Sequence, residues 1–133
     1  MSDLKPITGQ TKIIGIFGHP ITHTLSPAMH NAAFDALGLP YRYVPFDVHP
    51  DRLEGAVRGI VPLGILGLNI TIPHKEAILP FLDEVDEEAG KTGAVNTIEV
   101  ASGRLIGRNT DGRGFLESLR ERNIDLSGKR VIL

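Results

Sequence analysis

The sequence contains no cysteine, and no apolar stretch in it is long enough to span a membrane. A disulfide framework and cysteine oxidation are therefore excluded. Neither sign of charge is in large excess, because 14 Lys and Arg against 16 Asp and Glu give a net charge of -2, and the basic residues are scattered. We therefore expect no binding to nucleic acid or to an anionic membrane. The N-terminal residues lack the apolar core of a signal peptide, which predicts a cytoplasmic protein.

Two nucleotide-binding motifs are also missing. The run Ala89-Gly90-Lys91-Thr92 mimics the end of a Walker A loop, but Val85 stands where that loop requires a glycine. Gly112 and Gly114 are followed by Glu117 instead of a third glycine, so the dinucleotide fingerprint Gly-x-Gly-x-x-Gly is absent. The chain therefore shows neither a nucleoside triphosphate site nor a dinucleotide site.

A metal site is not expected either. His19 and His23 are four positions apart, but they flank Pro20 outside any expected helix. No cysteine and no His-Glu-x-x-His string accompanies them, although zinc sites are commonly built from such residues. With a nearly balanced charge, the partner most compatible with this composition is a small neutral or anionic metabolite.

The order of apolar patterns predicts an α/β fold. With 133 residues, 41% hydrophobic and 23% charged, the chain has the size and composition of one domain. Strands are expected at 12–18, 41–48, 66–71, 96–100 and 105–108, and helices at 26–37, 50–58, 75–82, 84–89 and 111–122. Strands that alternate with helices pair in parallel and bind ligands at their carboxyl ends. We predict three α/β/α layers around a mainly parallel, mixed sheet of about six strands.

Lys75 is the first candidate for chemistry. It ends the run Asn69-Ile70-Thr71-Ile72-Pro73-His74-Lys75, in which Pro73 suits the first turn of a helix. The positive end of a helix dipole disfavours an ammonium group, and a lysine held there becomes a proton acceptor near neutral pH. Asn69 and Thr71 should face the same side of the preceding strand. From this segment alone, the alternative is an exposed lysine that reaches into water.

Thr24 and Ser26 form a second candidate group. They place two hydroxyls beside the start of a helix that Ser26 and Pro27 would open, where backbone N–H groups favour an anion. Such a site could hold a carboxylate without an arginine. The alternative is that Ser26 only caps the helix and that Thr24 is an ordinary loop residue.

Two later segments add polar side chains. They are Gly93-Ala94-Val95-Asn96-Thr97 and Gly107-Arg108-Asn109-Thr110-Asp111-Gly112-Arg113-Gly114. The simplest interpretation of Asp111 is a cap on the helix that follows. A carboxylate near Lys75 would nevertheless let the pair exchange and stabilise a proton, as the oxidation of a hydroxyl to a ketone requires.

The four segments together, in this order over residues 15–114, resemble the N-terminal, substrate-binding domain of shikimate dehydrogenases. In that family they read Gly-x-Pro-x-x-His-Ser-x-Ser-Pro, Asn-x-Thr-x-Pro-x-Lys, Gly-Ala-x-Asn-Thr and Gly-x-Asn-Thr-Asp-Gly-x-Gly. The resemblance implies the reversible NADP-linked reduction of 3-dehydroshikimate to shikimate, a step of the chorismate pathway toward the aromatic amino acids. It also implies a small-molecule substrate and no metal, and it leaves the oligomeric state open, a homodimer included.

By matching position, the resemblance implies roles for single residues. Lys75 and Asp111 would be the catalytic pair. The substrate carboxylate and ring hydroxyls would be bound by Thr24, Ser26, Asn69, Thr71, Lys75, Asn96 and Asp111. Thr24 replaces the serine that is usual in the family, and its methyl group stiffens χ1 and takes room beside the carboxylate. A quinate/shikimate dehydrogenase therefore stays an alternative.

The resemblance also implies a domain organisation. Residues 1–125 would form the substrate-binding catalytic domain, and residues 126–133 a linker and the first strand of a missing Rossmann domain that binds NADP. We expect this chain alone to be inactive, and some apolar surface to be exposed where the rest of the protein would pack. The remaining alternative is a stand-alone binding module for a cyclic carboxylic acid.

Overall fold

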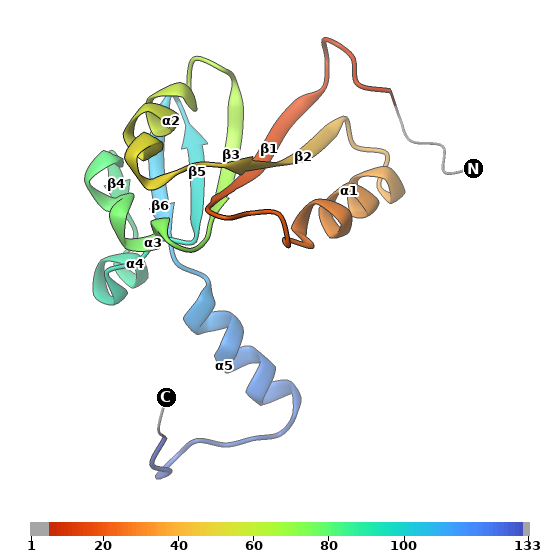
Figure 1. Ribbon diagram of the computed structural model, residues 1–133. Helices are drawn as coiled ribbons and strands as arrows, with labels where there is room; N and C mark the ends of the chain where they lie inside the picture. Colours follow the sequence, from red (N-terminus) through yellow and green to blue (C-terminus); the bar gives the residue numbers. More distant parts are fainter. Residues whose placement is uncertain (1–5, 132–133) are drawn as a thin grey trace.

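Six strands form one sheet in the computed structural model, which describes residues 6–131 (Figure 1). Their order across the sheet is β2-β1-β3-β5-β6-β4. The strands are β1 (Lys12–Gly18), β2 (Tyr41–Asp47), β3 (Ile65–Ile70), β4 (Glu84–Val85), β5 (Thr97–Ala101) and β6 (Arg104–Arg108).

The direction of the strands places several chain segments at one edge of the sheet. β1 is parallel to both β2 and β3, as the strand–helix alternation predicted. β5 is antiparallel to β3 and to β6, while β4 is parallel to β6. Of these six strands, β5 therefore runs against the others, and the predicted mainly parallel, mixed sheet is confirmed. The carboxyl ends of β1, β3 and β6 meet the amino end of β5 at the same edge.

Helices lie on both faces of the sheet (Figure 1). Ile16 and Phe17 of β1 point to opposite faces because side chains alternate along a strand. Ile16 packs with Tyr43 and the α1 residue Phe34, whereas Phe17 belongs to the larger cluster that contains α2. The predicted three layers are therefore confirmed. The helices are α1 (Ser26–Ala36), α2 (Leu53–Gly59), α3 (His74–Ala77), α4 (Glu87–Thr92) and α5 (Asp111–Glu121), with 3-10 turns at Pro50–Arg52 and Leu79–Phe81.

The larger core cluster holds the ends of β3 and β5 in place. Its largest fully buried hydrophobic side chains are Ile60, Leu68, Ile70, Ile78, Val95 and Ile98. Each buried side chain of this size contributes about 1.5–3 kcal/mol relative to an exposed one. Ile70 and Val95 are the immediate neighbours of the polar residues at the sheet edge, so the hydrophobic core positions that edge.

Two predicted helices differ from the structure. The helix expected at 75–82 is four residues of α3 followed by a 3-10 turn, because Pro80 has no N–H to continue the helical ladder. The helix expected at 84–89 begins as β4, since the backbones of Asp83 and Asp86 pair with β6. α4 starts only after Asp86, whose carboxylate accepts from the N–H of Ala89 at 2.7 Å. The first error therefore has a local cause, whereas the second comes from tertiary pairing that overrides local propensity.

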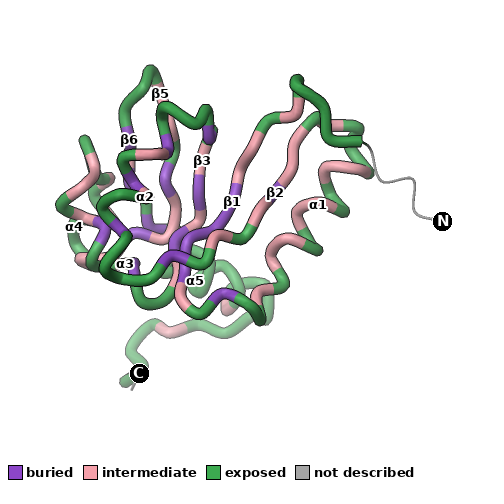
Figure 2. The backbone as a smooth tube through the Cα atoms, turned by 45° about the horizontal axis from the view of Figure 1, so that its top comes forward, coloured by how far each residue is buried: buried purple, intermediate pink, exposed green. Residues whose placement is uncertain are grey.

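α5 extends away from the sheet (Figures 1 and 2), and none of its residues is buried. Phe115 and Leu116 are about half exposed, at 50% and 46%, in line with the expected exposed apolar surface. Residues 129–131 are not in a strand, and residues 132–133 lie outside the described part of the chain. The assignment of 126–133 to a further domain stays a prediction. Within residues 6–131, no helix has the length and apolar character needed to cross a membrane.

Candidate active site

The side chains of Lys75 and Asp111 meet at the edge of the sheet where β1, β3 and β6 end. In the sequence, 36 positions separate them. The Lys75 ammonium Nζ donates to Asp111 Oδ2 at 2.5 Å. The two side chains are 33% and 56% exposed, so the pair is accessible from solvent without being fully hydrated. The structure therefore contradicts the alternative in which Lys75 only reaches into water.

Asn96 holds the same carboxylate from its other side. Its Nδ2 donates to Asp111 Oδ1 at 2.8 Å and to Thr110 Oγ1 at 2.9 Å, while its Oδ1 accepts from the N–H of Thr110 at 3.1 Å. The Lys75 ammonium, and secondarily the Asn96 amide, keep the pKa of Asp111 below its ordinary value although partial burial acts in the opposite direction. Asp111 is thus an oriented, ionised carboxylate. It does not cap α5, since the N-cap position is Thr110.

The helix dipole does not explain the importance of Lys75. α3 has only four residues, and a single turn sums few peptide dipoles. The prediction that a helix dipole makes Lys75 a proton acceptor is therefore wrong. The lysine is held instead by its ion pair and by its backbone, because the Lys75 carbonyl accepts from the N–H of Val95 at 2.8 Å.

His74 anchors α3 and was not recognised from the sequence. Its side chain is completely buried, and Nε2 lies 2.7 Å from the carbonyl oxygen of Val48, to which it can donate. Among the described residues, Nδ1 has no hydrogen-bond partner. Because a carbonyl oxygen can only accept, Nε2 is the donor in this contact. The residue next to Lys75 is thereby fixed in the core.

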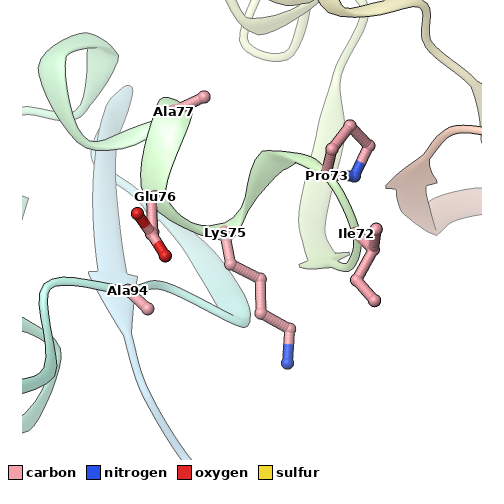
Figure 3. A pocket seen from close by; sticks show the side chains of 6 residues that line it. All are labelled: Ile72, Pro73, Lys75, Glu76, Ala77 and Ala94. Atoms are coloured by element: carbon pink, nitrogen blue, oxygen red, sulfur yellow. The ribbon is translucent and has the colours of Figure 1, made fainter.

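Lys75 lines an open hollow of about 680 Å³. The hollow is formed by Ile72, Pro73, Lys75, Glu76, Ala77 and Ala94. Figure 3 shows the Lys75 side chain extending between Ile72 on one side and Ala94 on the other. Ligand sites commonly have volumes of roughly 300–1,000 Å³. The amine therefore faces a space that can admit a small ring compound.

Thr24, Ser26 and Thr71 line a neighbouring hollow of about 420 Å³. Ile72 borders both hollows, so the three hydroxyl residues lie beside the space that contains Lys75. Thr24 Oγ1 accepts from the N–H of Ser26 at 3.3 Å. Ser26 itself is the first residue of α1 and makes no capping bond, which contradicts the alternative that it only caps the helix.

Gly18 lets the end of β1 approach Thr71 closely. A Cβ at position 18 would lie 2.5 Å from Thr71 Cγ2 and 2.7 Å from Ile21 Cδ1. The N–H of Thr71 donates to the carbonyl of Phe17 at 3.0 Å, so the chain after β3 continues along β1. This contact places Thr71 in the same hollow as the Thr24 and Ser26 segment.

Asn69 is already engaged with protein groups. Its Oδ1 accepts from the Tyr43 hydroxyl at 2.7 Å, and its Nδ2 lies 3.3 Å from Thr97 Oγ1 and 3.4 Å from the Asn96 carbonyl oxygen. Burial raises the pKa of Tyr43 to about 12, although the nearby Ser26 side chain acts in the opposite direction. Sequence reasoning assigned no role to Tyr43, because a tyrosine in a strand is ordinarily a packing residue.

The domain is recognisable by comparison with known proteins. A family described as the shikimate dehydrogenase substrate binding domain matches residues 16–98, which is more than half of the chain. The chain belongs to the shikimate dehydrogenase substrate-binding domain family. It is 57% identical over 121 residues to the shikimate dehydrogenase (NADP(+)) of Methanopyrus kandleri, an alignment that covers 91% of this chain and 42% of that relative. The chain therefore spans less than half the length of this relative.

Two solved shikimate 5-dehydrogenases share the architecture. The Listeria monocytogenes protein, in complex with shikimate and NAD, is 42% identical with a TM-score of 0.86 over 90% of this chain and 42% of its own. The Thermus thermophilus protein, in complex with NADP(H) and shikimate, is 43% identical with a TM-score of 0.81 over 87% and 44%. The predicted family and fold class are therefore confirmed. The roles of the individual site residues, Lys75 and Asp111 included, stay predictions.

Proposed function

We propose that this chain is the substrate-binding domain of a cytoplasmic, NADP-dependent shikimate dehydrogenase. The complete enzyme would reversibly reduce 3-dehydroshikimate to shikimate on the chorismate pathway of aromatic amino acid biosynthesis. The observation that carries the proposal is the Lys75–Asp111 pair, which borders an open hollow in a domain of this family. The names of the relatives and the shikimate bound to two structural neighbours support the choice of substrate.

The pair has the chemistry that interconversion of a ketone and an alcohol needs. In the reductive direction, the Lys75 ammonium donates a proton to the carbonyl oxygen as that oxygen gains negative charge. In the oxidative direction, the amine accepts the hydroxyl proton. Asp111 keeps Lys75 in place through the ion pair, and Asn96 keeps the Asp111 carboxylate aligned.

The remaining polar residues would orient the substrate. Thr24 and Ser26 lie in the hollow next to Lys75 and would receive the carboxylate through their hydroxyls. The ring hydroxyls would be held by Asn69, Thr71, Asn96 and Asp111. An ordered set of donors and acceptors around a small ring places the reacting hydroxyl at Lys75, which lowers the entropic cost of the proton transfer.

Within residues 6–131 there is no glycine-rich turn of the kind that binds a dinucleotide, the group that accepts or supplies the hydride. Gly112 and Gly114 lie inside α5 instead of in a turn between a strand and a helix, and the third glycine is missing. This chain matches 42% of the length of the Methanopyrus kandleri relative. We therefore propose that NADP is bound by another part of the complete enzyme.

Calorimetry on this chain with shikimate, quinate and NADP separately tests the assignment. We expect shikimate to bind weakly, with a Kd of about 1 mM, quinate to bind more weakly, and NADP not to bind. Binding of NADP to this chain would contradict the proposal that another part of the enzyme binds the cofactor. Preferential binding of quinate would support the quinate/shikimate alternative, which the names of the relatives do not favour. Shikimate binding as tight as in a complete dehydrogenase would support a stand-alone module.

A further inference from the structure

Tyr43 contacts a candidate site residue on another strand. Its hydroxyl donates to Oδ1 of Asn69, near the end of β3, at 2.7 Å. Tyr43 itself lies on β2 and is 3% exposed. One buried hydroxyl therefore holds a residue that is proposed to bind the ring hydroxyls.

The position of Tyr43 is set independently of its hydroxyl. β2 is an edge strand, and Asn31 of α1 pairs with the backbone of Tyr43 in both directions. The Tyr43 N–H donates to Asn31 Oδ1 at 2.8 Å, and Asn31 Nδ2 donates to the Tyr43 carbonyl at 3.0 Å. The ring of His30 stacks on the tyrosine ring with centroids 4.4 Å apart and planes 16° apart. The hydroxyl is thus presented at one fixed point.

The hydroxyl also determines how the Asn69 amide is oriented. With Oδ1 accepting from Tyr43 at 2.7 Å, the Nδ2 group must face Asn96 and Thr97, to which its contacts are long, at 3.3–3.4 Å. The short bond to Tyr43 is therefore the one that holds the amide. The hydroxyl is protonated and can donate at neutral pH, and burial, which raises the pKa of Tyr43 to about 12, extends this to more alkaline pH.

We propose that Tyr43 is a positioning residue of the substrate site, which fixes the orientation of the Asn69 amide. This inference rests on the proposed function. The site then selects cyclic acids that carry a ring hydroxyl within reach of that amide. Tyr43 does not touch the substrate and acts only through Asn69.

The test compares Tyr43→Phe with Tyr41→Phe, a matched change two residues earlier on β2, at a tyrosine whose ring packs against Phe34. The ligands are shikimate and cyclohex-1-ene-1-carboxylate, which has the ring and carboxylate but no ring hydroxyls. Calorimetry gives each Kd, and amide NMR spectra report whether each variant is folded. Tyr43→Phe should raise the Kd of shikimate about tenfold, because it removes one buried hydrogen bond and leaves Asn69 Oδ1 unpaired. The Kd of the hydroxyl-free acid should change less than about twofold, and Tyr41→Phe should change neither.

A double-mutant cycle between Tyr43→Phe and Asn69→Ala provides the second measurement. The double variant should lose clearly less shikimate affinity than the product of the two single losses, because both changes remove the same contact. Equal losses for both acids, multiplicative losses in the cycle, unchanged shikimate binding, or an unfolded Tyr43→Phe chain would each overturn the positioning role. Failure of the wild-type chain to bind shikimate is a different result, which rejects the proposed substrate and this role together.

Discussion

The Lys75 ammonium donates to Asp111 Oδ2 at 2.5 Å and so joins the second residue of α3 to the first residue of α5. The two helices follow different strands, β3 and β6, which are separated in the sheet by β5. The pair can form only when the antiparallel hairpin of β5 and β6 lies correctly beside β3. The chemistry of the site is therefore coupled to the sheet order.

Replacement of Lys75 by alanine should remove most of the turnover, because the amine is the proposed proton donor and acceptor. The measurement uses a chimera in which this chain replaces the matching part of the Methanopyrus kandleri relative. We expect kcat to fall about 10²–10⁴-fold and KM to change less than about fivefold. Lys91→Ala is the control, since Lys91 forms an exposed ion pair with Glu87 on α4 and should keep the activity of the chimera. An unchanged kcat in Lys75→Ala would remove the lysine from the mechanism.

Replacement of Asp111 by asparagine should change how stability depends on pH. The Lys75 ammonium keeps the pKa of Asp111 below its ordinary value of 3.8. The carboxylate therefore stabilises the fold fully above pH 3.8, and this contribution is lost as the pH falls through the lower folded-state pKa. Asp111→Asn should reduce the free energy of unfolding at neutral pH and make the acid decline shallower.

The size of that effect is limited by solvent, because the Asp111 side chain is 56% exposed. We expect less than about 1 kcal/mol, measured by urea denaturation at a series of pH values. Glu121→Gln, which removes a carboxylate from the exposed end of the same helix, is the matched control. Parallel stability curves for Asp111→Asn and the wild type would show that the ion pair contributes nothing to folding.

Replacement of Gly15 by alanine should destabilise the sheet. A Cβ at Gly15 would lie 2.3 Å from the carbonyl oxygen of Val44 and 2.6 Å from Cε2 of Phe46, and the backbone of β2 cannot yield without breaking its pairing. We expect a loss of about 1–3 kcal/mol in urea denaturation. Gly55→Ala in α2 is the control, because nothing lies within 4 Å of a Cβ there, and it should be neutral or stabilising. Equal stability of both variants would contradict the close approach of β1 and β2.

Replacement of His74 by alanine should reduce stability more than removal of an exposed histidine. His74 is fully buried and donates to the Val48 carbonyl, so its loss leaves a cavity and an unpaired acceptor. We expect a loss of about 2–4 kcal/mol in thermal or urea denaturation. His23→Ala, at an exposed loop position, should change stability by less than about 0.5 kcal/mol. Similar values for the two variants would contradict an anchoring role for His74.

The elements that sequence patterns predicted well are those with a strong local signal. The apolar run of β1 is bounded by a turn, and α1 starts at a serine–proline pair and ends before Gly38, where φ is +70°. The short segments between β3 and β5 were predicted poorly. There the backbone of Asp83 and Asp86 pairs with β6, and no local pattern reports a partner that comes later in the chain.

The sequence by itself determined the fold class, the family and the set of residues that carry the proposed chemistry. Hydrophobic periodicity and motif spacing are local properties of the chain, and they can be recognised without knowledge of the strand order. Only the tertiary structure decided that Asn96 orients Asp111, that Tyr43 holds the Asn69 amide, and that His74 is buried. These contacts depend on which strands are neighbours and in what register they pair, because hydrogen bonds act over about 3 Å whatever the separation in sequence.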